Sequence, residues 1–336
     1  MLIIPQEGRV YTKKGKFMKN NHRLYYAYSD HLKERYGEKV YKLPVNLPVS
    51  CPNRTGGKRG CSFCAGCGTG FEAMGAFVPV REQLEQTKQY IGPRYHAHKF
   101  IAYFQNYTNT FLPLPDFRRY AKEAAEVPDL VGISVSTRPD CVRRDYLDVL
   151  KDISAEYGLD ITIELGLQTV NYRTLERTGR GHGLAEFIDA VLAVREYGFD
   201  TCAHVILNLP GDDRTDCTET ARVLSSLRVA CVKIHSLYIA KNTRLCEEFE
   251  NGTIAVCPKE EYFRRLIVFL ENLSPHIAVE RLFSRVPEKD AVFCNWGRSW
   301  WALKDELIRQ MKLEGSYQGR CFHYLGGSAL DQLQGA

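Results

Sequence analysis

Three cysteines in one short segment carry the clearest chemistry in this chain. Cys51, Cys61 and Cys64 lie in CPNRTGGKRGCSFC, with nine residues between the first two and two residues between the last two. The Gly and Pro residues of the segment permit the turns by which three sulfurs reach one point. Structural zinc sites and ordinary [4Fe–4S] clusters use four protein ligands. Three cysteines therefore predict a metal centre with one open position.

A fourth thiol, Cys67, extends the run to CSFCAGC and leaves other interpretations open. All four cysteines could hold zinc or a closed cluster, and two of them could form a redox-active disulfide. The spacing favours an open iron–sulfur cluster over both.

Apolar, β-rich segments alternate with amphipathic helical patterns along the chain. The expected strands are residues 39–49, 100–105, 130–136, 161–167, 202–209 and 229–239. The expected helices are residues 81–91, 146–158, 184–198 and 215–227, with Gly158 and Gly198 at their carboxyl ends. This alternation predicts a parallel sheet covered by helices, either a barrel or a doubly wound sheet. In both folds the functional site lies at the carboxyl ends of the strands.

The Cys segment and five later motifs resemble the YhcC/YtqA family of radical S-adenosylmethionine (SAM) proteins, which is related to the radical SAM core of the Elongator catalytic subunit. The similar motifs, over about residues 23–285, are YYAYSDHLKERYGEKVYKLPVNLPVSCPNRTGGKRGCSFC, YFQNYTNT, STRPDC, ELGLQT, RGH and KIHSL. In such proteins three cysteines bind a [4Fe–4S] cluster, whose free iron binds SAM. Electron transfer then splits SAM into methionine and a 5′-deoxyadenosyl radical. The resemblance implies Cys51, Cys61 and Cys64 as ligands and Cys67 as a bystander.

The resemblance also implies a fold and partners. It resolves the fold class as α/β with a partial (β/α)6 TIM-like radical SAM barrel. The core is expected at residues 43–285, between a basic aromatic N-terminal extension, residues 1–42, and a C-terminal helical extension, residues 286–336, that carries three Trp residues. The cofactors are a [4Fe–4S] cluster and S-adenosyl-L-methionine, and a reducing electron donor such as flavodoxin or ferredoxin is expected.

Polar side chains after the expected strands are candidates to bind SAM. Phe63 is expected near the adenine, although a lone aromatic residue also serves to pack a loop. Asp140 and Thr169 fit better as a helix cap or turn. Contacts to the amino group, ribose or carboxylate of SAM are expected from Gln105, Asn109, Thr137, Arg138, Glu164, Gln168 and Arg180.

Two histidines, His204 and His235, occur within neighbouring expected strands. A strand histidine is more often a hydrogen-bonded core residue than a catalyst. Two of them on adjacent barrel strands nevertheless favour a place beside the substrate. We expect His204, before His235, to be catalytic.

The positive charge of the chain is concentrated near its start. Residues 1–50 contain ten Lys or Arg and four acidic residues, a net charge of +6, whereas the whole chain carries +5. Tyrosines alternate with the basic residues, and this combination favours RNA binding. A solvated helix packed on the barrel would have the same composition. The residues expected to contact tRNA are Lys13, Lys14, Lys16 and Lys19.

Composition fits one cytoplasmic enzyme. No apolar run approaches a membrane span or the core of a signal peptide, so no membrane partner is expected. The twelve cysteines are mostly scattered singly, as in reduced intracellular proteins. The resemblance implies modification of tRNA, at a carboxymethylaminomethyl-type C5 side chain of wobble uridine. The alternatives are a radical SAM enzyme for a small metabolite or peptide, and a non-enzymatic metal-binding or redox-sensing scaffold.

Overall fold

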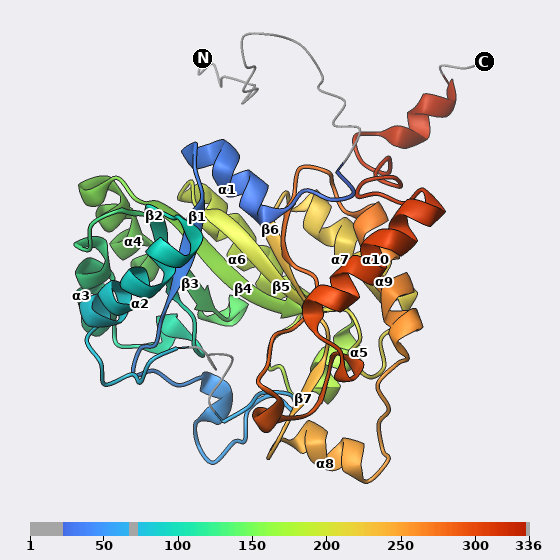
Figure 1. Ribbon diagram of the computed structural model, residues 1–336, viewed down its shortest axis with the longest axis horizontal. Coiled ribbons are helices and arrows are strands. Elements are labelled where there is room, and N and C mark those ends of the chain that lie inside the picture. The colour runs from blue at the N-terminus through green and yellow to red at the C-terminus, as the bar shows by residue number, and fades with distance from the viewer. Residues whose placement is uncertain (1–22, 67–72, 334–336) are drawn as a thin grey trace.

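The computed structural model describes residues 23–66 and 73–333 (Figure 1). Its central feature is one curled, wholly parallel sheet with strand order β1-β2-β3-β4-β5-β6-β8. The strands are β1 (Val40–Val45), β2 (Lys99–Phe104), β3 (Leu130–Thr137), β4 (Asp160–Gln168), β5 (Asp200–Ile206), β6 (Cys231–His235) and β8 (Ala278–Arg281). Because β1 and β8 are the two edges and do not pair, the sheet is a half-barrel, which confirms the predicted fold class.

The half-barrel has one strand more than the six predicted. The additional strand, β8, is only four residues long and has two apolar residues followed by two charged ones, so its pattern is weak in the sequence. A second difference is that residues 229–239 do not form one strand. Ser236 and Leu237 interrupt it, since the Leu237 amide donates to Asn208 Oδ1 at 2.6 Å. The segment after the break, β7 (Tyr238–Ala240), pairs antiparallel with β9 (Ala291–Cys294) in a separate small sheet.

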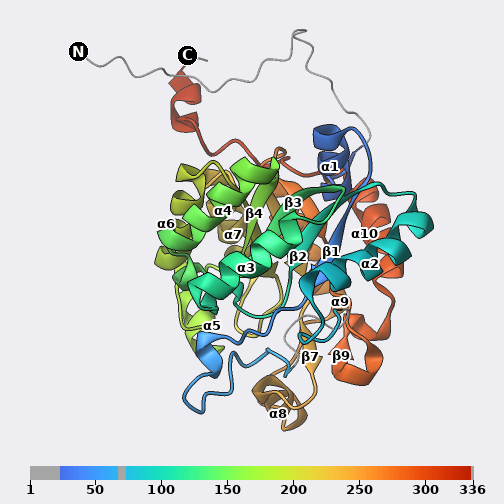
Figure 2. The same ribbon diagram turned by 90° about the vertical axis from the view of Figure 1, so that its left-hand side faces the viewer.

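Helices cover the convex face of the sheet, as Figure 2 shows for α3, α4 and α6. The four predicted helices are present as α2 (Val80–Tyr95), α4 (Arg144–Tyr157), α6 (Leu184–Glu196) and α7 (Arg214–Ser226). Gly158 follows α4 with φ +67, the left-handed conformation expected of a terminating glycine. The other helices are α1 (Tyr28–Tyr36), α3 (Leu114–Ala125), α5 (Tyr172–Arg177), α8 (Arg244–Glu250), α9 (Lys259–Asn272) and α10 (Trp300–Glu314).

The two faces of the strands differ in chemistry. On the convex face, apolar side chains such as Leu43, Phe104 and Leu165 are fully buried in the main core against the helices. On the concave face, the middle of the strands carries polar and charged side chains that contact one another. They are Lys42, Tyr103, Ser134, Glu164, His204, Lys233 and Glu280. The near-continuous apolar strands expected from the sequence therefore describe only one face of the sheet.

The amino-terminal end of the half-barrel is closed by α1. Tyr28 and Leu32 pack there against side chains of five strands, including Ile101 and Cys202. Ion pairs of Arg35 with two strand-start aspartates hold the helix in place. The described part of the basic aromatic extension thus contains a helix packed on the barrel through its Tyr residues, and its last three residues begin β1.

The carboxyl-terminal helix α10 also joins the main core, through Leu303, Leu307 and Met311. The division into segments at residues 42 and 285 stays a prediction. Within residues 23–66 and 73–333, no helix is both long enough and apolar enough to cross a membrane.

Candidate functional site

The cysteine-containing loop, residues 51–66, lies at the carboxyl end of the sheet, near β7 and α8 and at the opposite end from α1 (Figure 1). Backbone hydrogen bonds tie it to several elements there. The Ser62 amide donates to Thr178 O at 2.8 Å, and the Leu245 amide donates to Ser62 O at 2.9 Å. The Thr108 amide, beyond β2, donates to Ser50 O at 3.3 Å. These bonds fix the loop where parallel strands present functional side chains.

Donor groups lie close to two of the three thiols. Asn53 Nδ2 lies 3.3 Å from Cys61 Sγ, and Arg180 Nη1 lies 3.7 Å from the same sulfur. Arg138 Nη1 lies 3.9 Å from Cys51 Sγ. Hydrogen bonds and positive charge near sulfur stabilise thiolates and the net negative charge of their clusters. This donor set fits a cysteine-bound iron–sulfur cluster.

The thiols are not arranged for a single small ion. Within the described ranges, two groups of ligand side chains have donor atoms all within 4.8 Å of one another, and neither includes Cys51, Cys61 or Cys64. A cluster of several irons spreads its ligands more widely than one zinc ion does. Burial raises the pKa of the Cys64 thiol, with the nearby Cys61 as a second cause. Cys67 lies outside the described residues.

The polar segment after β2 contains two buried oxygen atoms without donors. Asn109 Nδ2 donates to the carbonyls of Phe104, Asn106 and Ser136, so this amide joins the ends of β2 and β3. In the described part of the chain, Oδ1 of Asn106 and Oδ1 of Asn109 have no hydrogen-bond donor, although both atoms are buried. A buried acceptor without a partner is costly, and an ammonium group satisfies such oxygens well. These atoms fit the amino group of SAM, which the sequence indicated at this strand end.

The residues predicted at the end of β3 are buried beside the loop. Arg138 pairs with Asp140 through Nε–Oδ1 at 2.8 Å and Nη2–Oδ2 at 2.7 Å, which aims its third nitrogen at Cys51. Asp140 lies in a 3-10 turn, Pro139–Cys141, as the sequence favours, and its carboxylate also holds this arginine. The Thr137 hydroxyl is 2.6 Å from Thr110 Oγ1. A role for Thr137 or Arg138 in binding SAM stays a prediction.

Gln168 and Arg180 come together at the end of β4. Gln168 has φ +75 at an irregularity in the β4–β5 pairing. Arg180 Nη2 donates to Gly166 O at 2.7 Å, and a Cβ on Gly166 would lie 2.4 Å from that nitrogen and 2.8 Å from Gln168 Nε2. A glycine is therefore required for the arginine to approach the strand.

The turn predicted for Thr169 is present, because its hydroxyl accepts the Asn171 amide at 3.1 Å.

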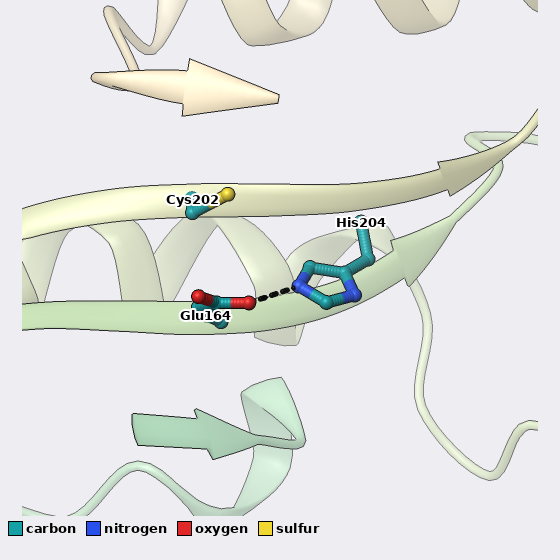
Figure 3. Close-up of side chains that lie close together, drawn as sticks. All are labelled: Glu164, Cys202 and His204. Carbon is teal, nitrogen blue, oxygen red and sulfur yellow. Dashed lines mark hydrogen bonds and ion pairs between the residues drawn. The ribbon is translucent and has the colours of Figure 1, made fainter. Parts of the chain in front are cut away.

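Glu164 lies deeper in the half-barrel than the other predicted SAM residues. Its carboxylate accepts hydrogen bonds from Lys42 at 2.5 Å, Ser134 at 2.6 Å and His204 at 2.6 Å. Figure 3 shows Glu164 and His204 facing each other from the neighbouring strands β4 and β5, with Cys202 beside them. Since three donors already occupy this carboxylate, the structure places Glu164 in an internal ion network, and its contact to SAM stays a prediction.

The charges of this network balance, because it contains two lysines and two glutamates. Glu280 accepts from Lys42 at 2.5 Å and pairs with Lys233 at 2.9 Å. Burial alone would raise the pKa of both carboxyls, but Lys233 and Lys42 outweigh it, holding the pKa of Glu164 well below its usual value and that of Glu280 at about 2. The network is therefore fully ionised at neutral pH. Lys42, Lys233 and Glu280 were not predicted from the sequence. The pattern that could have revealed them is one charged residue in each strand, placed so that all three face the same side of the sheet.

The two predicted catalytic histidines are neighbours, with ring centroids 5.5 Å apart. Burial lowers the pKa of His204 although Glu164 opposes it. Burial, Arg281 and His204 hold the pKa of His235 well below its usual value. Both rings line one cavity with Gln105 and Tyr103, so neutral imidazoles face the interior of the half-barrel.

The remaining predicted residues divide into two groups. Phe63 packs against an apolar cluster that includes Ile206 and Leu237, which accounts for the aromatic ring without a ligand. Its contact to adenine stays a prediction. The predicted RNA-binding residues Lys13, Lys14, Lys16 and Lys19 lie outside the described residues.

Sequence comparison agrees with this architecture. Residues 48–224 match the model of the radical SAM superfamily, and residues 229–312 match the radical SAM C-terminal domain. The chain belongs to the radical SAM superfamily. Within it, the chain belongs to the family of YtqA from Bacillus subtilis, with which it shares 32% identity over 91% of its own length and 95% of that protein. YhcC of Escherichia coli K12 is 31% identical over 86% of this chain and 94% of that protein.

A solved structure shares this fold, and a more distant protein is similar in sequence. The structure of the archaeal Elp3 from Methanocaldococcus infernus has a TM-score of 0.62 and 16% identity, over 83% of this chain and 64% of that one. In sequence, the tRNA uridine(34) acetyltransferase of Dehalococcoides mccartyi is 24% identical over 58% of this chain and 41% of that protein.

Proposed function

We propose that this chain cleaves SAM at a [4Fe–4S] cluster held by Cys51, Cys61 and Cys64 and uses the resulting radical to modify tRNA. The proposed cleavage of SAM is supported by the loop of three cysteines at the strand ends, where two arginines are directed at the sulfurs. When bound, the cluster would supply the electron that cleaves SAM.

The residues around the loop have separate parts in this proposal. Arg138 and Arg180 stabilise negative charge on the cysteine sulfurs, and Asp140 keeps Arg138 oriented. The buried oxygens of Asn106 and Asn109 accept hydrogen bonds from the amino group of SAM. Gln168, at the end of β4, donates to a polar group of the same ligand. His204 and His235 face the interior, where they contact the substrate.

The electron donor in this proposal is an acidic protein such as flavodoxin or ferredoxin. A surface cavity of about 780 Å³ borders Cys61 and Cys64, and its lining carries four cations, Arg54, Lys58, Arg59 and Arg244, against the two acids Glu176 and Glu186. Positive charge beside the cluster ligands favours an acidic partner and speeds its encounter.

The proposed substrate is the C5 side chain of wobble uridine, of the carboxymethylaminomethyl type. Support comes from the sequence likeness to a protein named as a tRNA uridine(34) acetyltransferase. A small metabolite or peptide is the other substrate class, and the experiment below separates the two.

The deciding experiment has two arms. Anaerobically reconstituted protein is incubated with SAM and dithionite, and 5′-deoxyadenosine is measured by mass spectrometry. Transfer RNA from cells with and without the gene is then digested and its nucleosides are compared. We expect SAM cleavage that depends on the three cysteines, and one wobble nucleoside that accumulates as precursor without the gene. SAM cleavage with identical nucleosides in both strains would reject tRNA and leave the small substrate.

A further inference from the structure

The open side of the half-barrel leads into a cavity of about 540 Å³, which we call the edge cavity. Both edge strands line it, β1 through Val40, Tyr41, Lys42 and Pro44 and β8 through residues 279–281. Its floor includes Tyr103, His204 and His235. A volume of this size is typical of pockets that enclose one small-molecule-sized group.

The edge cavity is strongly basic. Six cationic side chains line it, and Glu280 is the one acidic residue among its described lining residues. The cations are Lys39, Lys42, Lys233, Arg281, Arg285 and Lys304. Lys42 and Lys233 are compensated by the internal carboxylates. In residues 23–66 and 73–333, neither Arg281 nor Lys304 has a carboxylate within ion-pair distance, so the cavity has an excess of positive charge.

Aromatic side chains accompany this charge. Tyr25 and Tyr41 line the edge cavity. Trp300 lies in an adjoining recess that shares Tyr25, Arg285 and Lys304, and the guanidinium of Arg285 sits 3.9 Å from its ring centroid. Cations that pair with phosphates, next to aromatic faces on which bases stack, are the combination that binds unpaired RNA.

The floor offers hydrogen-bonding groups instead of apolar surface. His235 is held neutral because its pKa is lowered, so its ring can donate at one nitrogen and accept at the other. Tyr103 and Lys233 form a hydrogen-bonded pair at 3.1 Å beside it. Enzymes that act on a base remove it from the stack and read its edge with polar groups of this kind.

We propose that the edge cavity receives one unstacked nucleotide of an RNA substrate, with the strand phosphates on Arg281 and Lys304 and the base against His204 and His235. This inference rests on the RNA substrate proposed above. Gln105, at the end of β2, also lines the cavity. The cavity therefore extends to the same strand ends as the cysteine loop, so a nucleotide placed in it approaches the reacting end of the barrel.

The test is RNA binding by the full-length reconstituted protein. The variant Arg281→Gln/Lys304→Gln is compared with the parent by fluorescence anisotropy at several salt concentrations. The probe is a short RNA hairpin with uridine at the wobble position of its loop. The control, Arg264→Gln/Lys312→Gln, removes the same charge from exposed residues of α9 and α10 outside the cavity.

We expect the cavity variant to bind the hairpin about ten- to a hundredfold more weakly, with a salt slope smaller by roughly 0.7 for each phosphate that is no longer neutralised. The control should remain close to the parent. Iron content and circular dichroism establish that each variant is folded. An unchanged Kd and slope in a folded cavity variant would overturn the assignment.

A second measurement locates the nucleotide directly and does not depend on any variant. A hairpin with 4-thiouridine at the wobble position is irradiated with the parent protein, and the crosslinked peptide is identified by mass spectrometry. Crosslinks within residues 39–44, 103–105 or 279–285 support the edge cavity. Crosslinks confined to helices on the convex face overturn it. If the parent protein binds no hairpin, both the proposed RNA substrate and this inference are rejected. If the parent binds the hairpin and the cavity variant binds it equally well, only the edge cavity is rejected.

Discussion

Lys42 on β1 and Glu164 on β4 meet across the interior of the half-barrel, with Nζ 2.5 Å from Oε1, although they are 122 positions apart in the sequence. The lysine also reaches Glu280 on β8, at the other edge of the sheet. One ammonium group therefore joins the middle of the sheet and both of its edges. This contact holds the curvature of a sheet that has no closing hydrogen bonds between β1 and β8.

Replacing that ammonium should destabilise the fold. Lys42→Met leaves two buried carboxylates with Lys233 as their remaining lysine partner, and breaking a buried pair of this kind costs about 3 to 5 kcal/mol. We expect a lower urea midpoint. The double variant Lys42→Met/Glu164→Gln should recover part of the loss, because it removes one of the unpaired charges. A double variant less stable than Lys42→Met would contradict this account.

The cysteine loop makes a prediction about iron. Cys51→Ala, Cys61→Ala and Cys64→Ala should each lose iron and the charge-transfer absorption after anaerobic reconstitution. Cys67→Ala should retain both, because three ligands leave one iron open for SAM. Cys141→Ala is the matched control, since this thiol lies near Cys51 but is not an expected ligand. Loss of the cluster in Cys67→Ala would favour a closed site.

Asn106 offers a clean test of SAM binding. Its Oδ1 is buried without a donor in the described part of the chain, so Asn106→Ala should leave stability unchanged or raise it. If that oxygen accepts from the amino group of SAM, the affinity for SAM should fall about ten- to a hundredfold at unchanged iron content. Asn109→Ala is the contrasting variant, because its amide joins two strand ends and its loss should lower the melting temperature. Equal SAM affinity in Asn106→Ala and the parent would refute this contact.

His235 predicts how stability depends on pH. Burial and the neighbouring Arg281 and His204 hold its pKa well below the usual 6.5. Below pH 6.5 the unfolded chain binds a proton at this residue that the folded chain does not, so stability should fall as the pH drops. The contribution reaches at most about 1.4 kcal/mol per pH unit. His235→Gln should flatten the profile of unfolding free energy between pH 7 and 5, whereas the exposed control His276→Gln should not.

The N-terminal lysines give a separate prediction on RNA. Changing Lys13, Lys14, Lys16 and Lys19 to Ala should weaken tRNA binding and reduce its salt slope by roughly 0.7 to 0.9 for each phosphate that these lysines neutralise. SAM cleavage without substrate should be unaffected, which serves as the internal control. Identical tRNA affinity and slope in parent and quadruple variant would show that these lysines are only solvated.

Much of the fold and the position of the cysteine-containing loop could be predicted from the sequence. Strand and helix patterns are local, and the spacing of Cys51, Cys61 and Cys64 is a property of one short segment. The short strand β8 could not be predicted because four residues of mixed polarity carry little periodicity. The break between β6 and β7 could not be predicted because its cause, Asn208 on another segment, is distant in the chain.

The sequence by itself determined the family and the candidate site residues, since the cysteine spacing and the polar strand ends are local features of the chain. Only the tertiary structure decided which of them face each other. It placed Glu164 among Lys42, Ser134 and His204, because curling of the sheet turns alternate residues of distant strands toward one interior. It also gathered Arg281 and Lys304 at one opening, although nothing in their local sequence joins them, because residues of the edge strand β8 and the helix α10 line the same cavity only in the folded chain.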